Sequence, residues 1–226
     1  QHDALPIWFF YPGQNSQLKI QTALSEPIAS LFDPSFRISE DNGWPNFEAR
    51  IALALGAPQG SGPTAIRPIE FGVSGVVGQF RNTDIDDDNL AIDRFVSDVW
   101  GLGADLRWRI NDTFGVIAEF YTGDGLGTYN GAALQLFDPD RDFEGLRSTG
   151  GFGEIYVYWT PRLHSHFGYG IDDPVDSDVP FSAALLGRTQ NSTAYGNVLF
   201  DVTQNFRMAL EISRRDTRYR NPIVPD

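Results

Sequence analysis

Residues 99–122 read VWGLGADLRWRINDTFGVIAEFYT, and their pattern of side chains indicates the fold class. Apolar and polar side chains alternate along both of its halves, which are separated by a short polar break at residues 111–113. A period of two residues is typical of a β-strand whose two faces meet different surroundings. The stretch therefore predicts an antiparallel hairpin with one apolar face and one polar face.

The length of the turn follows from the alternation. Ile110 and Phe114 belong to the same apolar face, so an odd number of residues must separate them. Residues 111–113 have turn-forming side chains and are the shortest choice that satisfies this condition. The same reasoning predicts a second tight turn at residues 203–205.

Both turns also predict cross-strand pairs. The second turn places Asp201 opposite Arg207, which is a favourable pair. The first turn places Asp105 opposite Glu119, two like charges that repel unless a cation or water lies between them.

Short and long joins alternate along the chain. Residues 161–163 form a third short join, whereas the acidic join 81–98 and the join 123–151 are long, and the first 16 residues are expected to be irregular. Short turns on one side and long loops on the other are typical of outer-membrane barrels. The alternating segments number nine: 17–24, 47–55, 68–80, 99–110, 114–122, 152–160, 164–170, 193–202 and 206–215.

Composition excludes several classes of protein. The chain has 226 residues, 41% of them hydrophobic, so it can bury apolar surface. Its net charge of −13 argues against binding to nucleic acid, which requires a basic surface. No run of about 18 apolar residues is present, which excludes a transmembrane helix. Cysteine is absent, as is common in proteins of an oxidising envelope.

Alternation alone does not say which face is inside, because a soluble β-sandwich also alternates. Aromatic residues near the short turns, such as Trp108 and Trp159, favour a membrane interface. Glycines on the polar face would leave a lumen open. We therefore predict an all-β fold, an antiparallel up-and-down transmembrane β-barrel of which this chain supplies about nine to ten strands.

Three segments resemble strands of bacterial outer-membrane porins, and the trimeric DcaP-like porins in particular. They are residues 69–81 (IEFGVSGVVGQFR), 99–125 and 151–160 (GFGEIYVYWT). The resemblance implies a barrel in the outer membrane of Gram-negative bacteria, surrounded by lipid and assembled as a homotrimer. It implies passive diffusion of small polar or charged solutes, a long loop folded inward to narrow the pore, and neither enzymatic activity nor a cofactor.

The strand count and the chain end depart from that family. Nine strands is an odd number, whereas bacterial single-chain barrels have an even one, and the chain ends in NPIVPD rather than in a strand with a terminal aromatic residue. We therefore expect residues 1–226 to be one barrel domain that is a fragment, with strands missing at the C-terminal end and at the N-terminal end too.

The polar faces of the predicted strands carry ten charged residues that would line the pore. A solvated strand face is the simpler reading of the same pattern. If the face lines a pore, its charges would select solutes by their charge. The ten residues are Glu48, Arg50, Glu70, Asp105, Arg107, Arg109, Glu119, Glu154, Arg207 and Glu211.

An acidic run offers weak candidates for a metal site at Asp84, Asp86 and Asp88. The run is not an EF-hand, because Asn89 replaces the required glycine and Phe95 replaces the closing glutamate. A solvated acidic loop explains the run as well, so no metal is predicted.

Two alternative functions remain open from the sequence. One is a soluble or surface β-sandwich that binds carbohydrate or a protein partner. The other is an outer-membrane enzyme, for which His164 and His166 share one strand face beside Ser165. A metal site needs a third ligand, and a hydrolase needs a converging acid, neither of which the sequence identifies.

Overall fold

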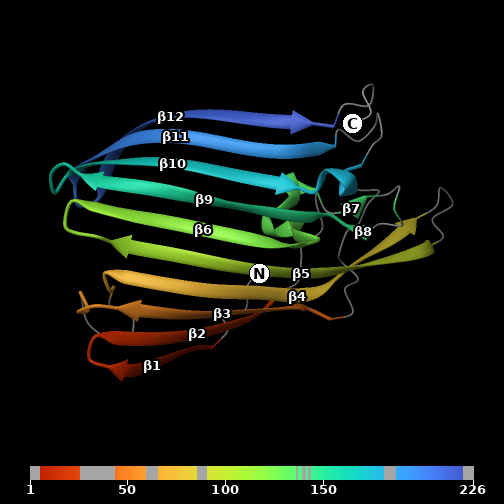
Figure 1. The fold of residues 1–226 in the computed structure, drawn as a ribbon, viewed down its shortest axis with the longest axis horizontal. Helices are drawn as coiled ribbons and strands as arrows, with labels where there is room; N and C mark the ends of the chain where they lie inside the picture. Colours follow the sequence, from red (N-terminus) through yellow and green to blue (C-terminus); the bar gives the residue numbers. More distant parts are fainter. Residues whose placement is uncertain are drawn as a thin grey trace.

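Ten strands form one antiparallel sheet, in which neighbours pair in chain order (Figure 1). The computed structural model describes residues 6–25, 44–59, 66–85, 91–135, 137–138, 141, 144–180 and 187–220. The all-β, up-and-down fold class predicted from the sequence is confirmed. The sheet strands are β1 (Ile7–Gly13), β2 (Ser16–Ser25), β3 (Asn46–Leu55), β4 (Ile69–Ile85), β5 (Ala91–Arg109), β6 (Phe114–Asp124), β9 (Arg147–Tyr158), β10 (Leu163–Pro174), β11 (Arg188–Thr203) and β12 (Phe206–Tyr219).

Short elements occupy the connections between β6 and β9 and between β10 and β11. Two 3-10 turns follow β6, η1 (Leu126–Tyr129) and η2 (Ala132–Leu134). The two-residue strands β7 (Phe137–Asp138) and β8 (Glu144–Gly145) pair with each other, and η4 (Asp176–Asp178) follows β10. In the described part of the chain, no helix is long and apolar enough to cross a membrane.

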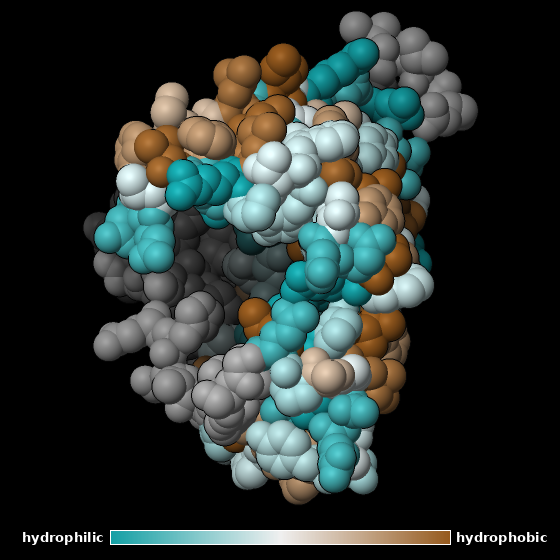
Figure 2. Space-filling model, turned by 90° about the vertical axis from the view of Figure 1, so that its left-hand side faces the viewer, coloured by the Kyte–Doolittle hydropathy of each residue, from teal (hydrophilic) through white to brown (hydrophobic). Residues whose placement is uncertain are grey.

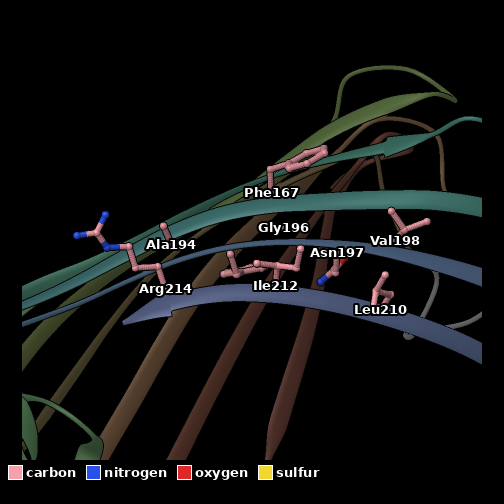
Figure 3. A pocket seen from close by; sticks show the side chains of 9 residues that line it. Phe167, Ala194, Gly196, Asn197, Val198, Leu210, Ile212 and Arg214 are labelled. Carbon is pink, nitrogen blue, oxygen red and sulfur yellow. The ribbon is translucent and has the colours of Figure 1, made fainter. Parts of the chain in front are cut away.

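The apolar face of the sheet is its exposed face. Ala52 and Ala54 are each 1% exposed, whereas their apolar neighbours Ile51 and Leu53 are 48% and 38% exposed. Viewed from the short-turn end, the sheet curves around a hollow (Figure 2). Apolar residues such as Phe167, Val198 and Leu210 lie on the exposed face (Figure 3), and the register places the polar residues of these strands on the face toward the hollow. This arrangement is the reverse of a soluble sandwich, whose apolar faces pack together.

The predicted turn after β5 is confirmed. Asn111 Oδ1 accepts hydrogen bonds from the backbone N–H groups of Thr113 and Phe114, both at 2.8 Å. This local bond replaces ladder bonds and reverses the chain. The resulting register places Asp105 opposite Glu119, as the parity of residues 99–122 predicts.

The N-terminal region differs from the prediction. Residues 7–13 are not irregular but form β1, which pairs with β2 through a tight turn at residues 14–15. Its run of consecutive aromatic residues conceals the alternation, because Trp8, Phe9 and Phe10 are apolar on both parities. The strand count in the described residues is therefore ten rather than nine.

Two predicted joins are shorter than expected. The join 81–98 is mostly strand, because β4 continues to Ile85 and β5 begins at Ala91. The turn at residues 203–205 has two residues outside the ladder rather than three, since Thr203 pairs with Phe206 after a register shift. The predicted pairing of Asp201 with Arg207 is nevertheless confirmed.

Candidate functional site

The concave polar face is the side of the sheet that faces the hollow. The register of paired strands places all ten charged residues singled out in the sequence on this face. Glu70, for example, lies opposite Arg107, which in turn lies opposite Ile117 and then Glu154. The face crosses eight strands from β3 to β12 and forms two separate side-chain networks.

The first network joins β2, β3, β4 and β5. Glu70 is its centre, with Lys19 Nζ at 2.6 Å, Arg50 Nη2 at 3.2 Å and Arg107 Nη2 at 3.5 Å from its carboxylate. Arg50 also binds Asp105, with Nη2 2.5 Å from Oδ1. The three cations therefore share two carboxylates.

A glycine makes this network possible. Gly72 lies opposite Asp105 and next to the path of Arg50, and a Cβ atom there would lie 2.4 Å from Asp105 Oδ2 and 2.6 Å from Arg50 Nη2. A side chain at this position would therefore force the ends of Arg50 and Asp105 to shift. The glycine on the polar face leaves room for an ion pair that spans three strands.

The second network joins β9, β10 and β11. His166 Nδ1 lies 2.7 Å from Glu154 Oε1, and His166 Nε2 lies 3.0 Å from His164 Nδ1. Tyr195 donates its hydroxyl to the other Glu154 oxygen. The ring of Tyr158 stacks on His164 with centroids 4.8 Å apart. The two histidines thus lie on one face, as predicted, and form part of a hydrogen-bonded chain.

A recess of about 430 Å³ lies between the two networks, near the short-turn end. Arg107 and Arg109 line one side, and His166 with two tyrosines lines the other. Arg109 is held by Asp112 at 2.8 Å. The recess therefore combines cations with aromatic rings, and polar solutes can contact both. The two tyrosines are Tyr156 and Tyr158, and Asp112 and Ile117 complete the lining.

Residues 125–135, here called the inward segment, pack onto the concave polar face. Leu126 is buried against Val99 and Phe80, which point inward from β5 and β4. Tyr129 reaches β3 and β2 on the same concave face, where its hydroxyl lies 3.0 Å from Asn46 Nδ2 and 3.2 Å from Ser25 Oγ. Burial raises the pKa of Tyr129, so its hydroxyl keeps its proton. The segment thus crosses part of the hollow.

The backbone of the inward segment is strained. Asn130 and residues 132–134 have φ between 50° and 65°, a region that residues other than glycine rarely adopt. Asp172 on β10 holds this backbone, because its Oδ2 accepts the Ala133 N–H at 2.5 Å and its Oδ1 accepts the Tyr121 hydroxyl at 2.5 Å. Such a conformation persists only where surrounding contacts determine it.

Asp178 anchors the adjacent connection after β10. Its carboxylate, 3% exposed, accepts bonds from Arg147 Nε at 2.6 Å and from Arg141 Nη1 at 2.8 Å. These two guanidinium groups, Arg147 first, hold the pKa of Asp178 well below its usual range. The carboxylate therefore stays charged and links Arg141, which precedes β8, and the start of β9 to η4.

The geometry does not support a hydrolase site or a metal site at the two histidines. Ser165 lies on the opposite strand face, where its Oγ accepts the Trp159 indole N–H at 3.0 Å. In the described part of the chain, no group of three or more His, Asp or Glu side chains is arranged to hold a metal ion. Asp84 is the last residue but one of β4, and Asp86 and Asp88 lie outside the described residues.

Lys19 and Tyr195 were not among the predicted pore-lining residues, although the alternation places both on the polar faces of their strands. Asp201 was predicted to lie opposite Arg207 on the polar face, and it does. Tyr129 carries no such signal, because it belongs to a connection whose path does not follow from periodicity.

No family model and no curated protein matches this chain. Among solved structures, the fold is similar to the outer membrane channel DcaP of Acinetobacter baumannii, with a TM-score of 0.64 and 14% sequence identity. The alignment covers 94% of this chain and 56% of the channel, so this chain spans little more than half the length of that protein. At this identity the likeness shows a shared β-barrel fold.

Proposed function

We propose that this chain is part of an outer-membrane porin that lets small polar or charged solutes diffuse through a water-filled barrel. The observation that carries the proposal is the inverted exposure of the sheet: its apolar face is exposed and its polar face encloses a hollow. In water, such a sheet would leave a wide apolar surface unburied. In a bilayer, the same surface meets lipid, and the polar face meets water.

Aromatic residues near the short turns support a membrane position. Trp108, Trp159 and Phe206 lie close to these turns on the outer face and are 42%, 60% and 58% exposed. Amphipathic rings concentrate at the level of lipid headgroups, where they form a girdle around a barrel. The short turns would then lie on the periplasmic side and the long connections outside.

The ten charged residues of the concave polar face would line the pore, together with Lys19 and His166. The two networks hold cations and carboxylates in fixed positions, so the lumen would have a transverse field that sorts solutes by charge. The inward segment would narrow the lumen toward the long-connection side. No chemical step is proposed, and the barrel would act as a passive channel without a cofactor.

Barrel closure would require further strands. Among the described strands, β1 pairs only with β2 and β12 only with β11, so each leaves one edge without a partner. An open edge within a membrane would leave backbone groups unsatisfied. We therefore propose that this chain is one part of a single barrel domain, which additional strands close. The full-length barrel would assemble as a homotrimer in the Gram-negative outer membrane.

The alternative of a soluble or surface sandwich is disfavoured by the same exposure pattern. It would require a second layer covering Leu53, Leu102 and Leu210, which are 38%, 61% and 70% exposed. An enzyme would require a converging catalytic group near the histidines, and Ser165 points to the other face.

Planar-bilayer recording of the full-length protein that contains this chain tests the proposal. Purified in detergent and added to a bilayer, it is expected to produce stepwise increases in ion current. Absence of current above background would remove the channel function. Recovery of the protein in solution without detergent would remove the membrane position as well.

A further inference from the structure

Two histidines and a glutamate form a hydrogen-bonded chain whose proton positions follow from the contacts. Glu154 accepts the Tyr195 hydroxyl at one oxygen, and its other oxygen lies 2.7 Å from His166 Nδ1. A carboxylate can only accept, so His166 Nδ1 carries the proton of that ring and His166 Nε2 is an acceptor. His164 Nδ1, 3.0 Å from this acceptor, must then donate to it. When both rings are neutral, the chain therefore has a single arrangement of protons.

That arrangement leaves His164 Nε2 without a proton and without a partner. A neutral imidazole carries one N–H, and in His164 this N–H is the one at Nδ1. His164 is 2% exposed, and its Nε2 is a buried atom to which no described residue forms a hydrogen bond. A buried acceptor without a partner is costly, and such atoms are rare in folded proteins. His164 Nε2 is therefore the atom of the chain that can bind a further proton.

Asp201 is the group that would hold a proton on His164 Nε2. Asp201 Oδ2 lies 3.9 Å from Nε2, so a proton there would form an ion pair with this carboxylate. Arg207 opposes a positive ring, but its guanidinium is bound to the same carboxylate, with Nε 2.5 Å from Oδ1. Burial also disfavours a charged ring. Uptake of a proton at Nε2 therefore depends on Asp201.

Charged and titratable groups of both signs surround the histidine pair. Glu154 favours a positive charge on the pair, whereas the arginines that line the recess with His166 disfavour it. Because His166 lines the recess, a charge that the pair gains acts on solutes there. The surrounding groups are Glu154, Tyr156 and Tyr158 on β9, Tyr195 and Asp201 on β11, Arg207 and Glu211 on β12, Arg107 and Arg109 on β5, and Asp112 in the turn after β5.

The pair can take up one proton but not two. A proton on His164 Nε2 leaves the existing contacts in place, because His164 Nδ1 still donates to His166. A second proton would go to His166 Nε2, where its N–H would face the His164 N–H across 3.0 Å. Two donors cannot share a hydrogen bond, and two positive rings repel each other. The pair is therefore a site for a single proton.

We propose that the His164–His166 pair binds one proton at His164 Nε2, and that this proton makes the lumen more selective for anions in acid. The proposal rests on the proposed channel function and adds regulation by pH to the same concave polar face. The added positive charge lies beside the recess that Arg107 and Arg109 line, and the charges of a pore lining select among ions. Imidazole suits this role, because its charge ordinarily changes between about pH 5 and about pH 8.

Nitrogen NMR of the full-length protein in detergent, isotopically labelled at histidine, tests the proton site. The signals are assigned by their loss in His164→Gln and His166→Gln. Both rings should carry the proton on Nδ1 at about pH 8, and His164 Nε2 alone should gain a proton by about pH 5. Uptake of two protons by the pair, no uptake in this range, or a proton on His164 Nε2 already at about pH 8 would overturn the site.

Asp201→Asn tests the carboxylate that would hold the proton. The variant removes the partner of the new N–H, so uptake at His164 should move to lower pH by about one unit. Asp98→Asn is the matched control, because it removes an equal charge from the exposed parity of β5, and it should leave the uptake unchanged. Equal titration curves for the two variants would contradict the role of Asp201.

The reversal potential in a planar bilayer under a salt gradient tests the consequence for transport. It should shift toward anion selectivity as the pH falls from about 8 to about 5, and the double variant His164→Gln and His166→Gln should lose this shift. A shift that persists in the double variant, or no shift in the unmodified protein, would overturn the role in selectivity. If no current is observed, the proposed function fails, while the NMR titration still decides the proton site.

Discussion

Arg50 on β3 binds Asp105 on β5 across the full width of β4. Arg50 Nη2 lies 2.5 Å from Asp105 Oδ1, and Arg50 Nε lies 2.9 Å from Oδ2. The pair is bidentate, which is the strong geometry for a guanidinium and a carboxylate. Arg50 also offsets the repulsion between Asp105 and Glu119, because these two carboxylates lie opposite each other.

Gly72→Val should separate this pair. The new side chain would occupy the space where the two charged groups meet, so the free energy of unfolding should fall by about 1–3 kcal/mol. Urea unfolding of the full-length protein in lipid vesicles measures the change. Gly153→Val is the control, because a Cβ there meets nothing within 4 Å. Equal unfolding midpoints for the two variants would contradict the role assigned to Gly72.

Replacing Arg107 and Arg109 with glutamate should shift ion selectivity toward cations. Both side chains line the recess on the concave polar face, where a reversal of charge acts directly on passing ions. The reversal potential under a salt gradient measures the shift. The control is the double variant Arg214→Glu and Arg218→Glu, which lies on the outer parity of β12, changes the net charge equally and should leave the potential unchanged. An unchanged potential in the double variant would refute a lining role for both arginines.

Tyr129→Phe should loosen the inward segment. The variant removes only the hydroxyl that contacts Asn46 and Ser25, so the segment would lose these contacts with β3 and β2. We expect larger or more strongly fluctuating single-channel currents. Tyr169→Phe, which removes a hydroxyl from the exposed outer face, is the matched control. Currents identical to those of the unmodified protein would show that Tyr129 does not restrain the segment.

Asp178→Asn should lower stability at neutral pH and much less in acid. Arg147 and Arg141 lower the pKa of Asp178, so its charged form stabilises the folded state above the unfolded pKa of about 3.9. This contribution is lost as the pH falls through the folded value. Thermal unfolding should therefore separate the variant from the unmodified protein at pH 5–7, by about 1–3 kcal/mol, and the difference should shrink below about pH 4. A difference that is constant with pH would exclude this origin.

Phe120→Arg should impair folding into a membrane far more than Glu119→Arg does, although the two residues are neighbours. Phe120 lies on the outer face and is 53% exposed, so an arginine there would face hydrocarbon at a cost of about 2–4 kcal/mol. Glu119 lies on the concave polar face, where water can solvate the new charge. Folding into lipid vesicles, followed by the gel mobility of the folded form, distinguishes them. Equal folding yields would indicate that the two faces do not differ in solvent.

Most of the sheet could be predicted from the alternation of side chains. Residues 99–122 were sufficient to predict a hairpin, its turn and the register of Asp105 with Glu119, because successive side chains of a strand point to opposite faces. β1 was not predicted in this way, because its aromatic residues occupy both faces of the strand. The end of β4 and the start of β5 were not predicted either, because the charged residues between 81 and 98 resemble a loop when burial is unknown.

The alternation of side chains is enough to establish that the strands have two chemically different faces and which residues share each face. That the apolar face is the exposed one became visible in the folded sheet, because alternation is symmetric with respect to inside and outside. The tertiary structure also decided which charges meet: Arg50 and Asp105 are 55 residues apart, and their contact depends on strand order, curvature and an intervening glycine. The path of residues 125–135 follows from packing and from Asp172, neither of which has a periodic signal.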